Sequence, residues 1–119
     1  MAGSLDTVKK ALQAFRDKDR DGIEAVIGDP YRFTSPRDNA IDRETFFARC
    51  WPNSESFTGM DVIHGAEDGE WAFVVYEASA GGKRFRNAEV HRVQNGRIIE
   101  TEVYFGWNLP HEAERGGFI

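Results

Sequence analysis

The sequence predicts an α+β fold, in which helices near the N-terminus pack on a mainly antiparallel sheet. Two observations predict this class. Apolar residues recur at helical spacing before residue 52, and strand-like segments follow from residue 56 onward. Three glycine-containing turns divide the second part into a meander of strands. Helices that precede a run of strands are typical of α+β domains.

Three helices are predicted before the strands. The first begins at Ser4, and its inward face consists of residues three or four apart: Leu5, Val8, Leu12 and Phe15. The second begins at Asp21, where Glu24 completes a capping box, and it ends at Gly28. The third is capped by Asp42, ends before Pro52 and directs four side chains inward: Phe46, Phe47, Cys50 and Trp51.

A short extended segment, residues 31–35, lies between the second and third helices. Four longer strands follow, at residues 56–66, 70–80, 83–93 and 97–107. The turns between them are Asp68-Gly69, Gly81-Gly82 and Asn95-Gly96. Residues 1–109 are therefore expected to form one domain, and residues 110–119 a C-terminal tail.

The composition argues against several classes of protein. The 119 residues carry a formal net charge of -5, which disfavours nucleic acid and anionic membrane surfaces as partners. No apolar run approaches the length of a membrane span, and the N-terminus lacks the pattern of a signal peptide. Cys50 is the only cysteine, so an internal disulfide is impossible and a cytoplasmic location is expected.

No metal and no cofactor are expected. The acidic run at residues 17–22 resembles the start of a calcium loop, but Gly28 occupies the position where that pattern requires a glutamate. We therefore interpret this run as a solvated turn between two helices. The sequence also lacks a phosphate-binding glycine loop, a nucleophile elbow and a paired-histidine motif.

The last hairpin determines which side chains share a face of the sheet. A two-residue loop at Asn95-Gly96 would pair Val93 with Ile98 and would place glutamates opposite each other, which is unfavourable. A three-residue loop pairs Val93 with Arg97 instead, and this slip moves every side chain of one strand to the other face. We predict the three-residue loop.

In this register a narrow polar stripe crosses the inner face of the sheet. The stripe consists of Asn87, Glu89, His91 and Thr101, and the same face continues with Phe105 and Trp107. A buried carboxylate must find a partner, take up a proton or meet solvent. An apolar concavity with a few convergent polar groups is the usual form of a small-molecule site. The outer face would carry mainly charged residues: Arg84, Arg86, Arg92, Glu100, Glu102 and Tyr104.

The order of elements and the final segment RFRNAEVHRVQNGRIIETEVYFGWNL, residues 84–109, resemble the NTF2-like superfamily, and in particular its SnoaL-like and ketosteroid isomerase-like domains. The matching motifs are Asn95-Gly96, Arg97-Ile98 and Tyr104-Phe105. The resemblance implies a cone, in which about three helices and a strongly curved sheet enclose a pocket. It also implies a small hydrophobic ligand and a homodimer formed through the outer face. The fold hosts several isomerase, lyase and hydrolase activities as well as non-enzymes.

Three catalytic positions of the ketosteroid isomerase branch can be compared with this chain. The family's oxyanion-hole carboxylate aligns with Glu89. Its general base precedes a proline, and that position here is Ser35, before Pro36. Its oxyanion tyrosine lies on the first helix, where this chain has no tyrosine. Asp38 is the candidate for a displaced base.

The candidate catalytic residues are therefore Glu89, His91 and Asp38, which could transfer protons. The candidate substrate-binding residues are Asn87, Tyr31, Ser35, Thr101, Phe105 and Trp107. Each has a structural alternative, such as a buried carboxylate satisfied by its neighbours or an aspartate in an ordinary turn. Two functions remain open. The protein is a cofactor-independent acid/base enzyme acting on a small hydrophobic carbonyl or polyketide-like compound, or it is a non-catalytic ligand-binding or dimeric association module.

Overall fold

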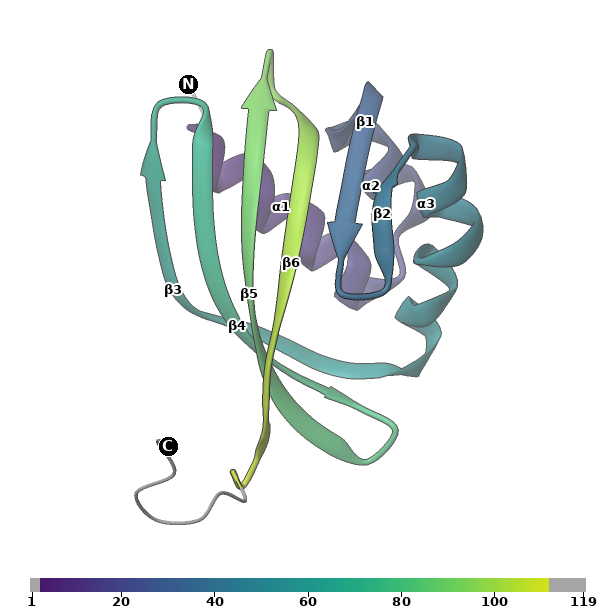
Figure 1. Cartoon of the computed structure of the whole chain (residues 1–119), viewed down its shortest axis with the longest axis vertical. Coiled ribbons are helices and arrows are strands. Elements are labelled where there is room, and N and C mark those ends of the chain that lie inside the picture. Colours follow the sequence, from purple (N-terminus) through teal and green to yellow (C-terminus); the bar gives the residue numbers. More distant parts are fainter. Residues whose placement is uncertain (1–2, 112–119) are drawn as a thin grey trace.

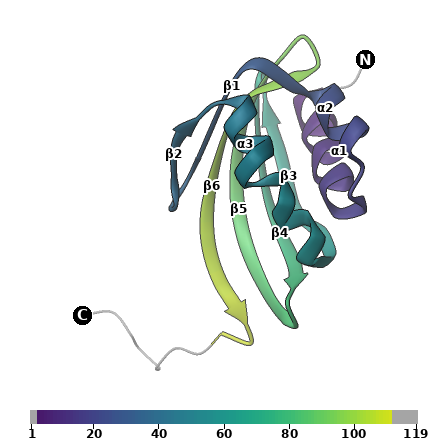
Figure 2. The same cartoon turned by 90° about the vertical axis from the view of Figure 1, so that its right-hand side faces the viewer.

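All helices lie on one face of a six-stranded sheet in the part of the chain that the computed structural model describes, residues 3–111 (Figures 1 and 2). The helices are α1 (Ser4–Asp17), α2 (Arg20–Val26), α3 (Arg43–Arg49) and a 3-10 helix, η1 (Trp51–Ser56). The strands are β1 (Ile27–Ser35), β2 (Asp38–Ile41), β3 (Phe57–Asp68), β4 (Trp71–Ala80), β5 (Lys83–Gln94) and β6 (Arg97–Leu109). Of the predicted tail, residues 112–119 lie outside the described part. No helix within that part is long and apolar enough to cross a membrane.

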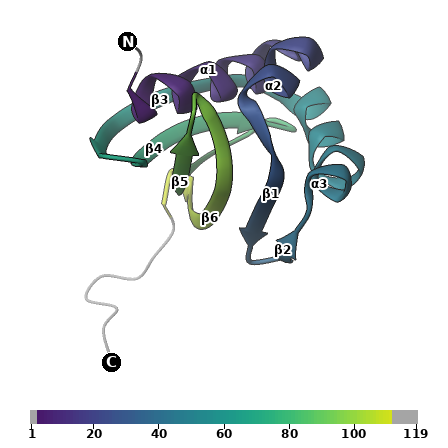
Figure 3. The ribbon, with the colours of Figure 1, turned by 90° about the horizontal axis from the view of Figure 1, so that it is seen from above.

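The sheet has the strand order β2-β1-β6-β5-β4-β3. The pairing of β1 with β6 is parallel, and the other four pairings are antiparallel. The α+β class, the three helices and the curved sheet are as predicted. Figure 3 shows the curl of the sheet, with α1 lying across its concave side.

The helix ends follow from capping side chains. The Asp19 carboxylate accepts a hydrogen bond from the Gly22 amide at 3.0 Å, so α2 begins one residue earlier than predicted and the acidic run serves as a helix cap. The Asp42 carboxylate accepts from the Thr45 amide at 2.9 Å, as predicted, and hydrogen bonds from Thr45 lower the pKa of Asp42. Ser4 is not the N-cap of α1, because its hydroxyl donates to the Trp71 carbonyl and ties α1 to β4.

Two elements differ from the prediction. The predicted segment 31–35 is the second half of the longer strand β1, and a tight turn joins it to β2, a strand that was not predicted. β2 has four residues with no apolar alternation, which leaves no strand signal in the sequence. The third helix ends at Arg49, and the chain continues through Pro52 as the 3-10 helix η1.

The last hairpin has a two-residue loop, so the predicted three-residue loop is wrong. Val93 pairs with Ile98, and both loop residues, Asn95 and Gly96, have positive φ angles of 53° and 73°. Asparagine and glycine tolerate this conformation better than other residues, and such a loop suits the twist of a hairpin.

A bulge at Ile99, two residue pairs beyond this loop, restores the predicted faces. Ile99 has no partner on β5, so Arg92 pairs with Glu100 and His91 pairs with Thr101. One extra residue reverses the alternation of β6, as the predicted loop would have done. The polar stripe therefore lies on the inner face, as predicted, although a different feature of the hairpin places it there.

A second bulge bends the far end of β6. Arg86 faces both Gly106 and Trp107, because Asn87 pairs with Phe105 and Phe85 pairs with Asn108. A Cβ atom at Gly106 would collide with the Arg86 carbonyl oxygen, so this close approach requires glycine. Bulges increase the bend and twist of a strand, and those in β6 and β3 account for the curvature of the sheet.

The core lies between the helices and the concave face of the sheet. Its buried side chains include Val8 and Leu12 of α1, Phe46 of α3, and Val74 and Ile98 of the sheet. The helical spacing of α1 and the alternation of β4 direct these residues to the same layer. The remaining space in this layer forms the candidate site.

Candidate active site

A cavity of about 760 Å³ lies within the concave side of the sheet. Its apolar wall comes from the helices and from four strands, and includes Phe15, Phe33, Phe46, Phe57, Phe85 and Phe105. Its polar wall comes mainly from the central strands β4, β5 and β6. This combination suits a small ligand that is largely apolar and carries a few polar atoms.

Four buried side chains form one half of the polar wall, and hydrogen bonds join three of them. The Nε2 atom of His91 lies 2.8 Å from Oε1 of Glu89, and its Nδ1 atom lies 2.9 Å from the Thr101 hydroxyl. The Tyr31 hydroxyl is within hydrogen-bonding reach of Thr101. All four residues are no more than 8% exposed, so water does not separate them.

The other half of the polar wall holds the Glu89 carboxylate from its second side. The amide of Gly106 donates to Oδ1 of Asn87 at 3.2 Å, and Nδ2 of Asn87 donates to the Tyr76 hydroxyl at 3.1 Å. The Tyr76 hydroxyl is in turn within hydrogen-bonding reach of Glu89. Tyr76 and Asn87 are direct cross-strand partners, which fixes this arrangement through the register of β4 and β5.

Burial makes both tyrosines very weak acids. Burial, and to a smaller extent the charge of Glu89, raise the pKa of Tyr76, and the hydrogen bond from Asn87 lowers it in part. Burial also raises the pKa of Tyr31, against the lowering effect of its hydrogen bond with Thr101. Each hydroxyl is therefore a hydrogen-bond donor near neutral pH and not a phenolate.

A second polar cluster surrounds Asp38 where β1 turns into β2. One carboxylate oxygen of Asp38 accepts from the Ser35 hydroxyl at 2.8 Å and lies 4.0 Å from the Cys50 sulfur. The other oxygen lies 3.2 Å from the Arg49 guanidinium. The Asp38 side chain is only 11% exposed and lines the cavity. The cavity therefore holds two separate carboxylates, one on β5 and one on β2.

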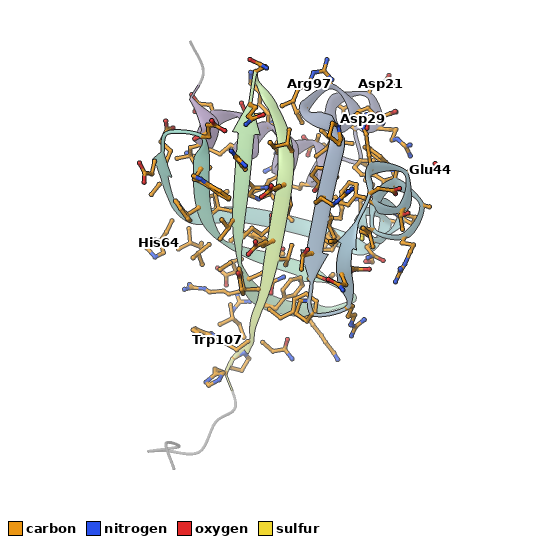
Figure 4. The ribbon with its side chains drawn as sticks, turned by 45° about the horizontal axis from the view of Figure 1, so that its top comes forward. Asp21, Asp29, Glu44, His64, Arg97 and Trp107 are labelled. Carbon is orange, nitrogen blue, oxygen red and sulfur yellow. The ribbon has the colours of Figure 1, made fainter. Side chains whose placement is uncertain are left out.

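The structure places eight of the nine candidate residues on the cavity: Tyr31, Ser35, Asp38, Asn87, Glu89, His91, Thr101 and Phe105. Trp107 is the exception, and its prediction as a lining residue is wrong. The bulge at Gly106 turns Trp107 away from the cavity and brings Asn108 in, so that Trp107 is 52% exposed near the lower end of β6 (Figure 4). Tyr31 and Thr101 contact the His91 chain, which is a different environment from the predicted substrate contact.

Tyr76 and Cys50 line the cavity but are not among the predicted site residues. A signal for Tyr76 exists in the sequence, because it lies in the alternating strand 70–80 at the same parity as the buried residues Ala72, Val74 and Ala78. Its register with Asn87 could not be assigned without the turn geometry. Among the described residues, no group of three or more histidine, cysteine, aspartate or glutamate side chains is arranged to hold a metal ion.

Solved structures of low sequence identity share this fold. A protein from Kribbella flavida DSM 17836, described as a proposed ketosteroid isomerase, is 14% identical with a TM-score of 0.78, over 98% of this chain and 87% of that one. An NTF2-like protein of unknown function from Cytophaga hutchinsonii is 17% identical with a TM-score of 0.77, over 89% and 92% of the two chains.

An LEH-like epoxide hydrolase from M. tuberculosis is 20% identical with a TM-score of 0.71, over 87% of this chain and 82% of that one. At these identities the likeness establishes the fold alone. A search of curated proteins finds no significant match. The family model of the SnoaL-like domain matches residues 8–101, which is most of the chain. The chain therefore belongs to the family of SnoaL-like domains.

Proposed function

We propose that the protein is a cofactor-independent acid/base enzyme that moves a proton on a small, hydrophobic carbonyl compound. The single observation that carries this proposal is the buried Glu89 carboxylate, which faces the cavity and is held by His91 on one side and Tyr76 on the other. A carboxylate fixed in this way is oriented for proton transfer before a ligand arrives.

In the proposed reaction Glu89 removes a proton from a carbon atom next to the ligand's carbonyl group. The carbonyl oxygen gains negative charge as the proton leaves. The side-chain nitrogen of Asn87 has a second N–H group besides the one donated to Tyr76, and we propose that it orients the carbonyl. Glu89 then returns the proton to the same carbon or to another one, which would give exchange or isomerisation.

Asp38 provides a carboxylate near Ser35, the position where some family members have their general base. Ser35 has no basic group, but its hydroxyl donates to Asp38, which places a carboxylate beside the expected position. Arg49 occupies one oxygen of Asp38, and Ser35 and Cys50 occupy the other. We therefore assign proton abstraction to Glu89 and a supporting position at the ligand's other end to Asp38.

Deuterium exchange tests this proposal without knowledge of the natural substrate. Cyclohexenone and larger bicyclic enones would be incubated with the protein in heavy water, and deuterium at carbons next to the carbonyl would be followed by proton NMR. The wild type should accelerate exchange of at least one ketone, and Glu89→Gln should reduce that rate roughly hundredfold or more, as is typical for loss of a general base.

The matched control is Glu102→Gln, because Glu102 lies on the outer face of β6 and is exposed. This variant should exchange at the wild-type rate. Full activity of Glu89→Gln would refute the role of Glu89. If no ketone exchanges but the ketones raise the melting temperature of the wild type, the alternative function is supported, namely a non-catalytic ligand-binding module.

We also propose that the protein is a cytoplasmic homodimer. The support for the dimer is the outer face of the sheet, where Phe73, Val75, Val90 and Tyr104 form an apolar patch that no helix covers in the described part of the chain (Figure 2). Charged pairs of both signs flank this patch, Glu77 with Arg84 and Glu70 with Arg92. A patch with both signs at its rim is complementary to itself under two-fold symmetry.

A further inference from the structure

Both nitrogens of His91 are occupied by other protein groups, so neither nitrogen is free to bind a ligand. It joins Glu89 to Thr101 through hydrogen bonds, and the Tyr31 hydroxyl lies within reach of Thr101. The two end members, Glu89 and Tyr31, both line the cavity. The chain therefore connects two separate points of the ligand site through buried groups that each can accept one proton and give another.

We propose that this chain is a proton relay, which delivers a proton from Tyr31 to the ligand's carbonyl oxygen while Glu89 removes a proton from its carbon. The inference rests on the proposed function and deepens it. It assigns Tyr31 as a catalytic residue and Thr101 and His91 as the groups that connect it to Glu89. The substrate class is a hydrophobic ketone that reacts through a neutral enol.

The donor directions in the chain follow from the two atoms that His91 contacts. With a proton on each nitrogen, Nε2–H donates to Glu89 and Nδ1–H donates to the Thr101 oxygen. Thr101 then donates to the Tyr31 oxygen, and the Tyr31 hydroxyl is free to donate into the cavity. In this state the imidazolium neutralises the Glu89 carboxylate. The two groups lie 2.8 Å apart, so their opposite charges offset each other within the buried wall.

The proton balance of the relay closes. Glu89 takes the carbon-bound proton on the carboxylate oxygen that His91 does not contact, and Tyr31 gives its proton to the ligand oxygen. Thr101 gives its proton to Tyr31, and His91 gives its Nδ1 proton to Thr101. The ligand has lost a C–H bond and gained an O–H bond, so the ketone has become its enol. The protein has lost no proton, because the imidazolium–carboxylate pair has become a neutral imidazole and a carboxylic acid.

The reverse flow completes an isomerisation. Glu89 gives its proton to a different carbon of the enol, and the enol O–H returns its proton to Tyr31, then to Thr101 and His91. The pKa of Tyr31 is raised by burial, so a phenolate would be costly in this wall. A relay that replaces the Tyr31 proton as it leaves avoids that charge.

Substitutions at Thr101 test the relay, because Thr101→Val keeps the shape of the side chain and removes the hydroxyl. The β,γ-unsaturated isomer of cyclohexenone is the probe, and formation of the conjugated enone is followed by ultraviolet absorbance. Thr101→Val and Tyr31→Phe should each slow isomerisation roughly hundredfold. Thr101→Ser keeps the hydroxyl and should retain most of the wild-type rate. If Thr101 acted only by packing its methyl group, Thr101→Ser would be impaired and Thr101→Val would not.

A second readout does not require turnover. In the wild type, nitrogen NMR of His91 should show two protonated ring nitrogens, with slow solvent exchange of the Nδ1 proton. Thr101→Val should make that exchange faster, and Glu102→Gln should leave it unchanged. A single protonated nitrogen in the wild type would overturn the relay, even if the ketone were isomerised.

Equal isomerisation by wild type and Thr101→Val, with loss of activity in Glu89→Gln, would also overturn the relay while leaving the proposed function intact. If the wild type neither exchanges nor isomerises any ketone, the proposed function fails. The number of protonated nitrogens on His91 then tests only the hydrogen bonds of the chain, and the assignment of Tyr31 as a catalytic residue is withdrawn.

Discussion

At the scale of single residues, Cys50 illustrates how the cavity wall controls chemistry. Burial, and to a smaller extent the neighbouring Asp38 carboxylate, raise the pKa of the Cys50 thiol to about 11. The thiolate is the reactive form of cysteine, so Cys50 is a poor nucleophile near neutral pH. Its S–H group lies near Asp38, where it contributes to the polar end of the cavity.

Alkylation of Cys50 should therefore depend steeply on pH. The rate with iodoacetamide should rise from pH ~8 to ~11 as the thiol ionises, and at the lower end it should be roughly a hundredfold slower than in the urea-unfolded chain. Asp38→Asn removes a nearby negative charge, lowers the pKa of the thiol and should speed the reaction at pH ~9. Mass spectrometry measures the modified fraction. Equal rates in folded and unfolded protein would contradict this account.

At the scale of secondary-structure elements, strand β6 determines the site through its two bulges. The bulge at Ile99 sets which face carries Thr101, and the bulge at Gly106 sets where the cavity wall ends. Gly106 also donates its amide to Asn87, which links the second bulge to the side chain that holds Tyr76. The irregular strand therefore positions the polar wall of the cavity more directly than the regular strands do.

Gly106→Ala should destabilise the protein, because its Cβ atom would collide with the backbone carbonyl of Arg86. Overpacking of this kind costs roughly 1–3 kcal/mol, and urea denaturation measures it as a lower midpoint. Gly59→Ala on β3 is the matched control, since no atom lies within 4 Å of the added methyl group. It should change the free energy of unfolding by less than about 0.5 kcal/mol. Similar losses in the two variants would exclude the collision as the cause.

The sequence predicts the elements and the inner face of the sheet well, because the apolar alternation within a strand does not depend on the exact loop length. Glu89, His91 and Thr101 share a face in either of two registers that differ by two residues, so the error in the hairpin loop did not affect them. Trp107 lies beyond the second bulge, where one extra residue inverts the pattern. A bulge depends on local backbone pairing, and alternation alone carries no signal for it. The same holds for the contact between Tyr76 and Asn87, which is set by register.

At the scale of the whole molecule, the outer face of the sheet carries no helix in the described part of the chain (Figure 2). Phe73 is 43% exposed and Tyr104 is 53% exposed on this face, on either side of β5. Exposed aromatic side chains that cluster on one face commonly mark a protein–protein interface. The cavity opens on the opposite side, so association would leave it accessible.

Light scattering at micromolar concentration should report a dimer for the wild type. Phe73→Glu places a charge in the apolar patch and should give a monomer with an unchanged circular dichroism spectrum. Lys10→Glu also introduces a glutamate at an exposed position, but on α1, and this variant should remain dimeric. A monomeric wild type, or dissociation by both substitutions, would contradict the proposed interface.

The parallel pairing of β1 with β6 has a consequence for how the protein is made. Ile27 pairs with Ile98, which lies 71 residues later in the chain. β1 therefore cannot pair with β6 until most of the chain has been synthesised. During translation, a nascent chain that ends before β6 has neither the His91–Thr101 contact nor a lateral support for the β1–β2 hairpin. Contacts between distant segments close late and slow the folding reaction. The cavity can therefore assemble only after β6 has been made.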